Sequence, residues 1–213
     1  MNLMKLGAGI AGVSGASGIG ILGAYYSGVF STNKNTIQEK LKRNKWTILE
    51  DSKSEHKSHW STSLTKYKSK HSGNENLTET QLKKICSDLL KKEDDDSYEE
   101  ARKYCVVPNK VSERLEKLGF TLLDISTSGS SSNPNQTQWT SLATKYKTKG
   151  VESKELDTLK ANTINDNGAN WHSLKDKCKE VSEKDHWSDK YESLVNNSKT
   201  WCTMQGFEGI SSL

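Results

Sequence analysis

The stretch WSTSLTKYKSK, residues 60–70, recurs almost unchanged as WTSLATKYKTK, residues 139–149. Trp, Thr, Lys, Tyr, Lys and Lys coincide between the two copies without a gap. In both copies the aromatic and leucine side chains lie three and four residues apart, the spacing of one face of a helix. Because an internal repeat reveals the unit from which a chain is built, the sequence predicts a helical module that is used twice.

The similarity continues on both sides of these blocks. Upstream, LKRNKWTILEDS at residues 41–52 resembles LEKLGFTLLDIS at residues 115–126, so that Trp46 corresponds to Phe120. Downstream, each copy carries a first Cys, then a Tyr and a second Cys. We expect the aromatic side chains of the two blocks to pack in the cores of the modules. These repeat-core aromatics are Trp60, Tyr67, Trp139 and Tyr146.

The composition favours small helical cores and gives no nucleic-acid signature. Hydrophobic residues make up 32% of the chain and the mean hydropathy is -0.81, but six Trp and seven Tyr supply packing area that a disordered chain lacks. The 31 basic residues are nearly balanced by 27 acidic residues, which is typical of a solvated surface of mixed charge. Only Arg43, Arg102 and Arg114 are arginines, so few side chains can bind phosphate through the bidentate hydrogen bonds of a guanidinium. We expect no nucleic-acid partner.

The N-terminal residues 1–30 are predicted to be a membrane anchor or a signal segment. Residues 6–30 carry no charge, and a helix of that length crosses a hydrocarbon core of about 30 Å. Small residues at every fourth position would let two such helices approach closely in lipid, so the anchor also predicts self-association. A cleaved signal peptide and a soluble Gly-rich tail are the alternatives. The small-residue face comprises Ala8, Gly12, Ala16, Gly20, Ala24 and Gly28.

The cysteines predict one disulfide in each module, Cys86 with Cys105 and Cys178 with Cys202. Each bridge would close a loop of roughly 20 residues and stabilise the fold by about 3 kcal/mol. Four reduced core thiols are the alternative, and they would suit a cytoplasmic domain. The basic residues that follow residue 30 favour the cytoplasmic side by the positive-inside rule. We give the cysteines more weight and expect the extracellular face.

Two related helical modules are expected to follow the anchor. A capping box at Thr78 to Gln81 marks the clearest helix start. Ser97 is expected to cap the next helix and Pro108 to start a third. The last helix is expected to end at Gly206, with Trp187, Tyr191, Leu194 and Trp201 on one face. The polar stretch STSGSSSNPNQTQ, residues 126–138, is typical of a flexible linker. The predicted fold class is therefore all-α, with an N-terminal membrane-spanning or signal helix and two small helical modules. The predicted domains are residues 1–30 (anchor), 31–126 (module 1), 127–137 (linker) and 138–213 (module 2).

No motif in the chain indicates catalysis, a metal or a cofactor. GxSxG, HExxH and CxxC are absent from the sequence, and no Gly-rich loop follows a strand. His56 and His59 form an HxxH that is interpreted as a pair of exposed histidines. The acidic run at residues 93–96 lacks the spacing of a calcium loop and is interpreted as a solvated turn. We expect no enzymatic activity and no cofactor.

As a whole the chain resembles the expanded paralogous families of short hypothetical proteins found in haemotrophic mycoplasmas. The resemblance lies in the apolar run GAGIAGVSGASGIG at residues 7–20, the Trp-Thr and Lys-Tyr-Lys blocks, the spaced cysteines and the Lys-Asn-Ser bias. It implies a membrane-associated, surface-exposed protein of a type connected with host interaction or antigenic variation. It brings no functional residues with it.

The functional expectation is a membrane-anchored, surface-exposed helical repeat protein that serves as an antigen or binds a host protein or glycan, or a secreted one if residues 1–30 are cleaved. One alternative is a structural, membrane-tethered protein that faces the cytoplasm. A second is a polyanion-binding protein that uses the Lys-Tyr-Lys blocks, because aromatic rings among lysines suit anionic glycans or single strands. Such binding would weaken steeply with salt.

Overall fold

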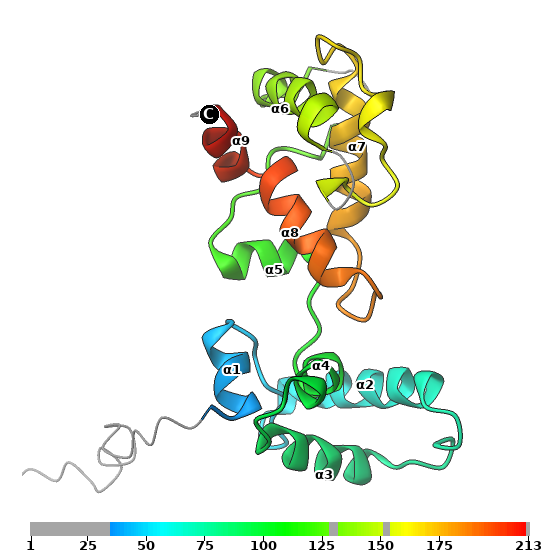
Figure 1. The fold of residues 1–213 in the computed structure, drawn as a ribbon. Coiled ribbons are helices and arrows are strands. Elements are labelled where there is room, and N and C mark those ends of the chain that lie inside the picture. Colours follow the sequence, from blue (N-terminus) through cyan, green and yellow to red (C-terminus); the bar gives the residue numbers. More distant parts are fainter. Residues whose placement is uncertain (1–34, 128–131, 151–153, 212–213) are drawn as a thin grey trace, which may run out of the picture. The chain divides into compact units, whose positions relative to one another are not determined.

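The computed structural model describes residues 35–127, 132–150 and 154–211. Within these ranges the regular structure is helical and β-type pairing is limited to isolated bridges, which confirms the all-α class. Figure 1 shows the helices along the chain. They are α1 (Ile37–Arg43), α2 (Lys57–Lys70), α3 (Glu79–Leu90), α4 (Asp95–Tyr104), α5 (Val111–Leu118), α6 (Gln136–Lys149), α7 (Trp171–Ser182), α8 (Tyr191–Trp201) and α9 (Met204–Ser211), with 3-10 turns η1 (Ser54–His56) and η3 (Ala161–Thr163).

Helices α1 to α4 pack together as the first repeat, residues 35–107. The start of α3 is fixed by the predicted capping box, in which the Thr78 hydroxyl accepts from the Gln81 amide and the Gln81 side chain accepts from the Thr78 amide. Leu82, Cys86 and Leu89 follow on the buried face of this helix, three and four residues apart. This pattern confirms the amphipathic helix expected after residue 78.

Helices α5 to α8 repeat this arrangement over residues 108–204, here named the second repeat. The same backbone hydrogen bonds recur at corresponding positions, which shows that the duplication is structural as well as sequential. In the first repeat they are Trp46 N to Leu41 O, Leu49 N to Cys105 O and Val107 N to Thr47 O; in the second they are Phe120 N to Leu115 O, Leu123 N to Cys202 O and Met204 N to Thr121 O.

The repeat-core aromatics lie in matching positions of the two cores. Trp60 and Trp139 are 4% and 0% exposed, on α2 and α6. The ring of Tyr67 meets Tyr104 edge to face at 4.9 Å, and the ring of Tyr146 meets Trp201 in the same way at 4.9 Å. Edge-to-face pairs of this kind add about 0.5–1.5 kcal/mol beyond the burial of their area.

One disulfide ties together the last two helices of each repeat. Cys86 is bonded to Cys105 and Cys178 to Cys202, with Cα separations of 5.4 and 5.7 Å. Both bridges lie within a repeat, which is the pairing predicted from the sequence. All four cysteines are 1% exposed or less, so the bridges are part of the cores.

Helix α5 belongs with the second repeat by its packing, since it contacts α8 and α7. The structural repeat therefore restarts near residue 108, close to where the sequence repeat restarts. The stretch that precedes α6 is tied to it, because the Asp124 carbonyl accepts from Asn133 Nδ2 at 2.9 Å and from Trp139 Nε1 at 3.2 Å. Asn35–Leu213 clusters as one compact unit, and the domain boundary at residues 127–137 stays a prediction.

Three helix boundaries differ from those expected. Helix α4 is capped by Asp94, whose carboxylate accepts from the Ser97 amide at 2.8 Å, and not by Ser97 itself. Helix α5 begins at Val111 and not at Pro108, because Glu113 caps the Lys110 amide. The helix that carries Trp201 was expected to end at Gly206, but α8 ends at Trp201 and Gly206 lies inside the separate helix α9. Side-chain hydrogen bonds to the backbone decide the first two positions.

The predicted N-terminal anchor, including Ala8, Gly12, Ala16, Gly20, Ala24 and Gly28, lies outside the described residues. Within the part of the chain that the structure describes, none of the helices has the length and apolarity needed to span a membrane.

Candidate binding site at the junction of the repeats

The junction between the repeats is built around the indole of Trp46, which follows α1 and is 4% exposed. The guanidinium groups of Arg114, on α5, and Arg102, on α4, lie 4.0 and 5.9 Å from its ring centroid. The rings of His186 and Tyr191, from the second repeat, lie 6.1 and 6.2 Å away. A cation over an indole contributes about 0.5–2 kcal/mol. Trp46 therefore gathers groups from both repeats.

Arg114 joins the repeats through backbone carbonyls. It is 5% exposed and donates to Asn44 O and, at 3.1 Å, to Lys45 O of the first repeat. The backbone of Lys45 is left-handed, with φ of 58°, a conformation in which a non-glycine residue is disfavoured. The corresponding residue of the second repeat is Gly119, with φ of 89°. This turn after α1 presents the two carbonyls to the guanidinium.

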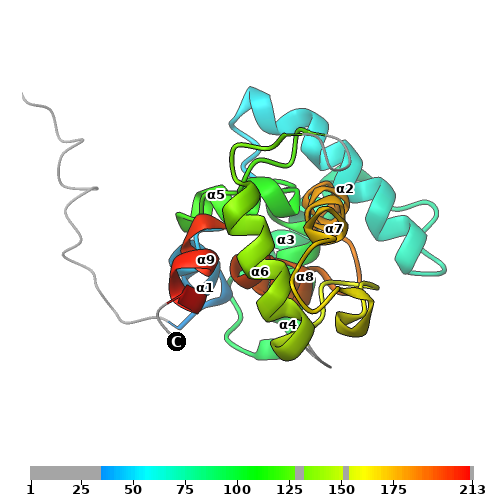
Figure 2. The same ribbon diagram turned by 90° about the horizontal axis from the view of Figure 1, so that it is seen from above.

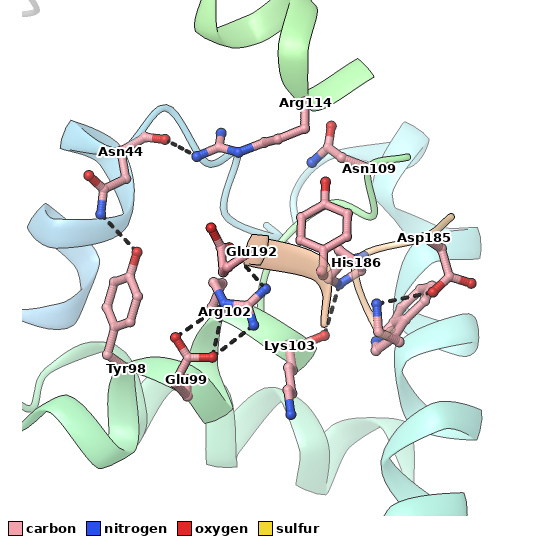
Figure 3. A network of polar contacts seen from close by, with 12 residues as sticks. Asn44, Tyr98, Glu99, Arg102, Lys103, Asn109, Arg114, Asp185, His186 and Glu192 are labelled. Atoms are coloured by element: carbon pink, nitrogen blue, oxygen red, sulfur yellow. Dashed lines mark hydrogen bonds and ion pairs between the residues drawn. The ribbon is translucent and has the colours of Figure 1, made fainter. Parts of the chain in front are cut away.

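A second buried arginine, on the first repeat, pairs with a carboxylate of the second repeat, as Figure 3 shows. Arg102 is 4% exposed, donates to Glu99 on its own helix at 2.7 Å and lies 3.4 Å from the Glu192 carboxylate on α8. Beside it, Asn44 Nδ2 donates to the Tyr98 hydroxyl at 2.8 Å. A buried guanidinium needs such partners, since an unpaired buried charge costs several kcal/mol.

The side chain of His186 lies at the centre of the junction and is fully buried. Its Nε2 lies 3.0 Å from the carbonyl oxygen of Lys103 in the first repeat. Because a carbonyl only accepts, Nε2 carries the proton, while Nδ1 is buried with no hydrogen-bond partner among the described residues. Burial lowers the pKa of His186 to about 4, a fall opposed by the Lys103 hydrogen bond. The imidazole is therefore neutral at pH 7.

An open cleft of about 510 Å³ lies beside His186, between α2 and α4 of the first repeat and the loop before α8. Two ion pairs cross it, Lys66 to Asp185 at 3.9 Å and Lys70 to Asp189 at 3.6 Å. Both are solvent-exposed and long, so each contributes little to stability. The cleft is lined by Lys66, Ser69, Lys70, His71, Glu100, Lys103, Tyr104, Asp185, Trp187, Ser188 and Asp189.

Trp187 is the aromatic group of this cleft. Its indole is partly exposed, with the ammonium of Lys66 at 5.3 Å from the ring centroid and the ring of His186 at 4.0 Å. We expected Trp187 to share a helix face with Tyr191, but α8 begins only at Tyr191. Trp187 thus belongs to the loop, where its side chain faces the other repeat.

A second groove, of about 420 Å³, borders Trp46 and Arg114. Arg43 also lines it, and Arg102 pairs with two carboxylates of its wall, those of Glu99 and Glu192. All three arginines of the chain therefore meet at the junction. In the sequence, the scarcity of arginine argues only against phosphate recognition. Their chain-wide rarity is the signal that would have singled out this place.

The two Lys-Tyr-Lys blocks have different surroundings. The hydroxyl of Tyr146 donates to Leu159 O at 2.6 Å and accepts from the Leu156 amide, and burial raises the pKa of Tyr146 to about 12. Tyr67 is partly exposed and stacks on the ring of His71 at 3.9 Å. The tyrosine rings therefore serve packing, and of the block lysines Lys66 borders the cleft.

The HxxH pair is not exposed as expected. His56 is 5% exposed, and its Nδ1 accepts from the Glu50 amide at 2.9 Å, which fixes the loop after Leu49. Its ring lies 6.4 Å from that of His59. In residues 35–127, 132–150 and 154–211, no three His, Cys, Asp or Glu side chains are close enough to hold a metal ion together.

The predicted site residues and the cleft do not coincide. The four cysteines and the aromatics Trp60, Tyr67, Trp139 and Tyr146 lie in the two cores, and none of them lines the cleft. The cleft residues were missed because loop and helix-end side chains from distant parts of the chain form it. In comparisons with known proteins, no family model, no curated protein and no solved structure matches this chain.

Proposed function

We propose that the chain is a non-catalytic binding protein held at the cell surface. Residues 1–30 would anchor it in the membrane, and the two repeats would lie on the extracellular face as an antigen or host-interaction module. If residues 1–30 are cleaved, the same module is secreted. The proposed resemblance to the surface-protein families of haemotrophic mycoplasmas agrees with this assignment.

The observation that carries the proposal is the pair of disulfides at corresponding places in both repeats. Disulfides persist in oxidising compartments and are rare where thiols are kept reduced. Each bridge closes a loop with a sequence separation of 19 or 24 residues, worth about 3 kcal/mol of stability in the chain-entropy description. A cytoplasmic, membrane-tethered structural protein would lose that contribution in both cores.

A binding role fits the buried ionisable groups better than catalysis does. His186 is neutral and fixed by Lys103 O, while the hydroxyls of Tyr146 and Tyr191 bond to backbone carbonyls. General acid-base catalysis needs a group whose pKa lies near the working pH and that can reach substrate. Burial instead lowers the pKa of His186 and raises that of Tyr191. His186 and Tyr191 therefore serve to hold the junction together, and Tyr146 serves the core of the second repeat.

The charges of the cleft favour a partner that carries both signs, such as a segment of a host protein. Lys66, Lys70 and Lys103 face three carboxylates across the same walls. A uniform polyanion would meet the carboxylates as well as the ammonium groups, and like charges at close range disfavour binding. The cleft therefore supports protein recognition over polyanion binding.

Protease treatment of intact cells tests the surface display. Trypsin should remove residues 35–213 from intact cells, because lysines are exposed throughout both repeats. A cytoplasmic protein detected in the same samples serves as the control for lysis. Mass mapping without reductant should find Cys86 joined to Cys105 and Cys178 to Cys202. Protection of the chain in intact cells together with free thiols would refute the proposal in favour of the cytoplasmic alternative.

A further inference from the structure

The internal junction pairs a basic face of one repeat with an acidic face of the other. The basic face, on the first repeat, consists of Trp46, Lys66, Lys70 and Arg102 with the carbonyls of Lys45 and Lys103. The acidic face, on the second repeat, consists of Asp185, Asp189 and Glu192 with Arg114 and His186. Three ion pairs connect them, at 3.9, 3.6 and 3.4 Å. Complementary charge of this kind sets which surfaces pair and in which register.

The second repeat carries its own copy of the basic face. Lys199 lies 5.7 Å above the ring of Phe120, just as Arg102 lies 5.9 Å above that of Trp46. The backbone hydrogen bonds and the WxxxxxKYKxK blocks fix the remaining correspondences. In the second repeat, Phe120 corresponds to Trp46, Lys145 to Lys66, Lys149 to Lys70, and Lys199 to Arg102.

Helix α9 covers this second basic face. The positions that it contacts on the second repeat correspond to the positions that the second repeat contacts on the first. Gln205 Nε2 donates at 3.3 Å to Gly119 O, the counterpart of the Lys45 carbonyl that accepts from Arg114. Gly206 lies against the Thr200 carbonyl so closely that a Cβ would come within 2.3 Å of it. Thr200 corresponds to Lys103, whose carbonyl faces His186. Helix α9 packs on α6 and α8 (Figure 2). It thus stands where a further repeat would dock.

The first repeat carries two carboxylates at positions that correspond to the acidic face. The Ile37 amide donates to Lys92 O just as Val111 donates to Lys184 O, which aligns the two faces. Glu93 then corresponds to Asp185, and Lys40 to Arg114. Asp95 and Glu192 correspond because each lies ten residues before the second cysteine of its repeat. The Asp95 side chain is 95% exposed and the Glu93 residue is also exposed. This acidic face has the chemistry needed to meet a basic face.

We propose that α9 is a cap that blocks head-to-tail association of this chain with a second copy. Without the cap, the basic face of one copy binds the carboxylates of Glu93 and Asp95 on the first repeat of the next copy, and so repeats the charge pairing of the internal junction. Such a contact joins two different surfaces, so it adds copies in a row and does not stop at a dimer. Terminal caps serve the same purpose in other repeat proteins. The proposal is independent of surface display.

Removal of α9 from the otherwise full chain tests this inference. A stop after Thr203 deletes the helix, while Gln205→Ala with Phe207→Ser loosens it and keeps every residue in place. Sedimentation velocity in one detergent, at protein concentrations up to about 100 μM, compares both variants with the wild type. Any association through residues 1–30 is common to all samples. Carbodiimide cross-linking of mixed 14N and 15N chains identifies the paired surfaces, since it joins lysines to carboxylates.

The uncapped chains should form concentration-dependent oligomers with mixed-isotope cross-links from Lys145 or Lys199 to Glu93 or Asp95. Glu93→Lys with Asp95→Lys should weaken this association at least about tenfold and leave the capped chain unchanged. Circular dichroism checks that each variant is folded, and the loosened full chain decides the outcome if the truncated chain is not. Folded, uncapped chains that sediment like the wild type overturn the inference. Oligomers whose association is not weakened by the charge reversal overturn the inference as well.

Discussion

Acid should destabilise this fold in a pH range set by His186. In the unfolded chain its imidazole binds a proton near its ordinary pKa of 6.5, whereas in the buried junction it does so only near 4. Between these values the unfolded state binds more protons, so each fall in pH favours unfolding. Each pH unit is worth 1.36 kcal/mol, which gives about 3 kcal/mol lost by pH 4. That is a large part of the 5–15 kcal/mol typical of a folded domain.

The environment of His186 explains why the loss is not offset. Desolvation is the largest cause of the low pKa, and Arg102 and Lys66 also disfavour a further cation at this place, while the Lys103 hydrogen bond and Asp185 oppose the fall only in part. The carboxylates whose pKa values are lowered in the folded chain, such as Glu50 and Glu180, also lose stabilisation in acid. They do so below their ordinary pKa of 4.5. Between pH 6.5 and 4.5 the change in stability therefore reports on His186 and not on these carboxylates.

Urea unfolding from pH 7.5 to 4.5 measures the effect, with His186→Gln as the perturbation. Glutamine cannot titrate but keeps an N–H that can donate to Lys103 O. We expect the variant to be less stable at pH 7.5 by about 1–2 kcal/mol, from lost ring packing, and to lose about 2–3 kcal/mol less between pH 6.5 and 4.5. His59→Gln, at a partly exposed position, should keep the wild-type slope. Equal slopes in the wild type and His186→Gln would refute the reasoning.

Four further variants test the junction and the cores by the same unfolding measurement. Cys178→Ser with Cys202→Ser should cost about 3 kcal/mol through the loss of one loop closure, and an unchanged midpoint under non-reducing conditions would contradict it. Lys45→Gly should stabilise by about 1 kcal/mol, because Lys45 holds a left-handed φ of 58°, whereas Gly119→Ala should cost about as much at φ of 89° in open space. Arg114→Met should cost about 2–4 kcal/mol because two buried carbonyls lose their donor, and a loss below 0.5 kcal/mol would show that water replaces it.

The sequence predicts the helical repeat well because its signals are local. The capping box at Thr78, the buried stripe that follows it and the glycine after α5 all act within a few residues of one another. The pairing of cysteines follows from the order of elements within each copy. Such features depend on backbone geometry that the flanking residues set, so they are visible before any tertiary contact is known.

The junction could not be predicted in the same way. Arg114 binds carbonyls 69 and 70 residues away, and His186 faces a carbonyl 83 residues away. Backbone acceptors leave no trace in a sequence, and a lone His or Arg has no periodic pattern. Gly206 was expected to end the helix that carries Trp201, because glycine usually ends helices. It lies instead inside α9, where close contact with the Thr200 carbonyl leaves no room for a Cβ.

The disulfide of the second repeat has a consequence for how the molecule survives damage. The loop that carries Trp187 lies between Cys178 and Cys202, so one peptide-bond cleavage there leaves the two fragments covalently joined. A nicked chain would run as one band without reductant and as two bands with it. Since α7 and α8 would keep their anchor points, such a clipped molecule should remain assembled where proteases are abundant.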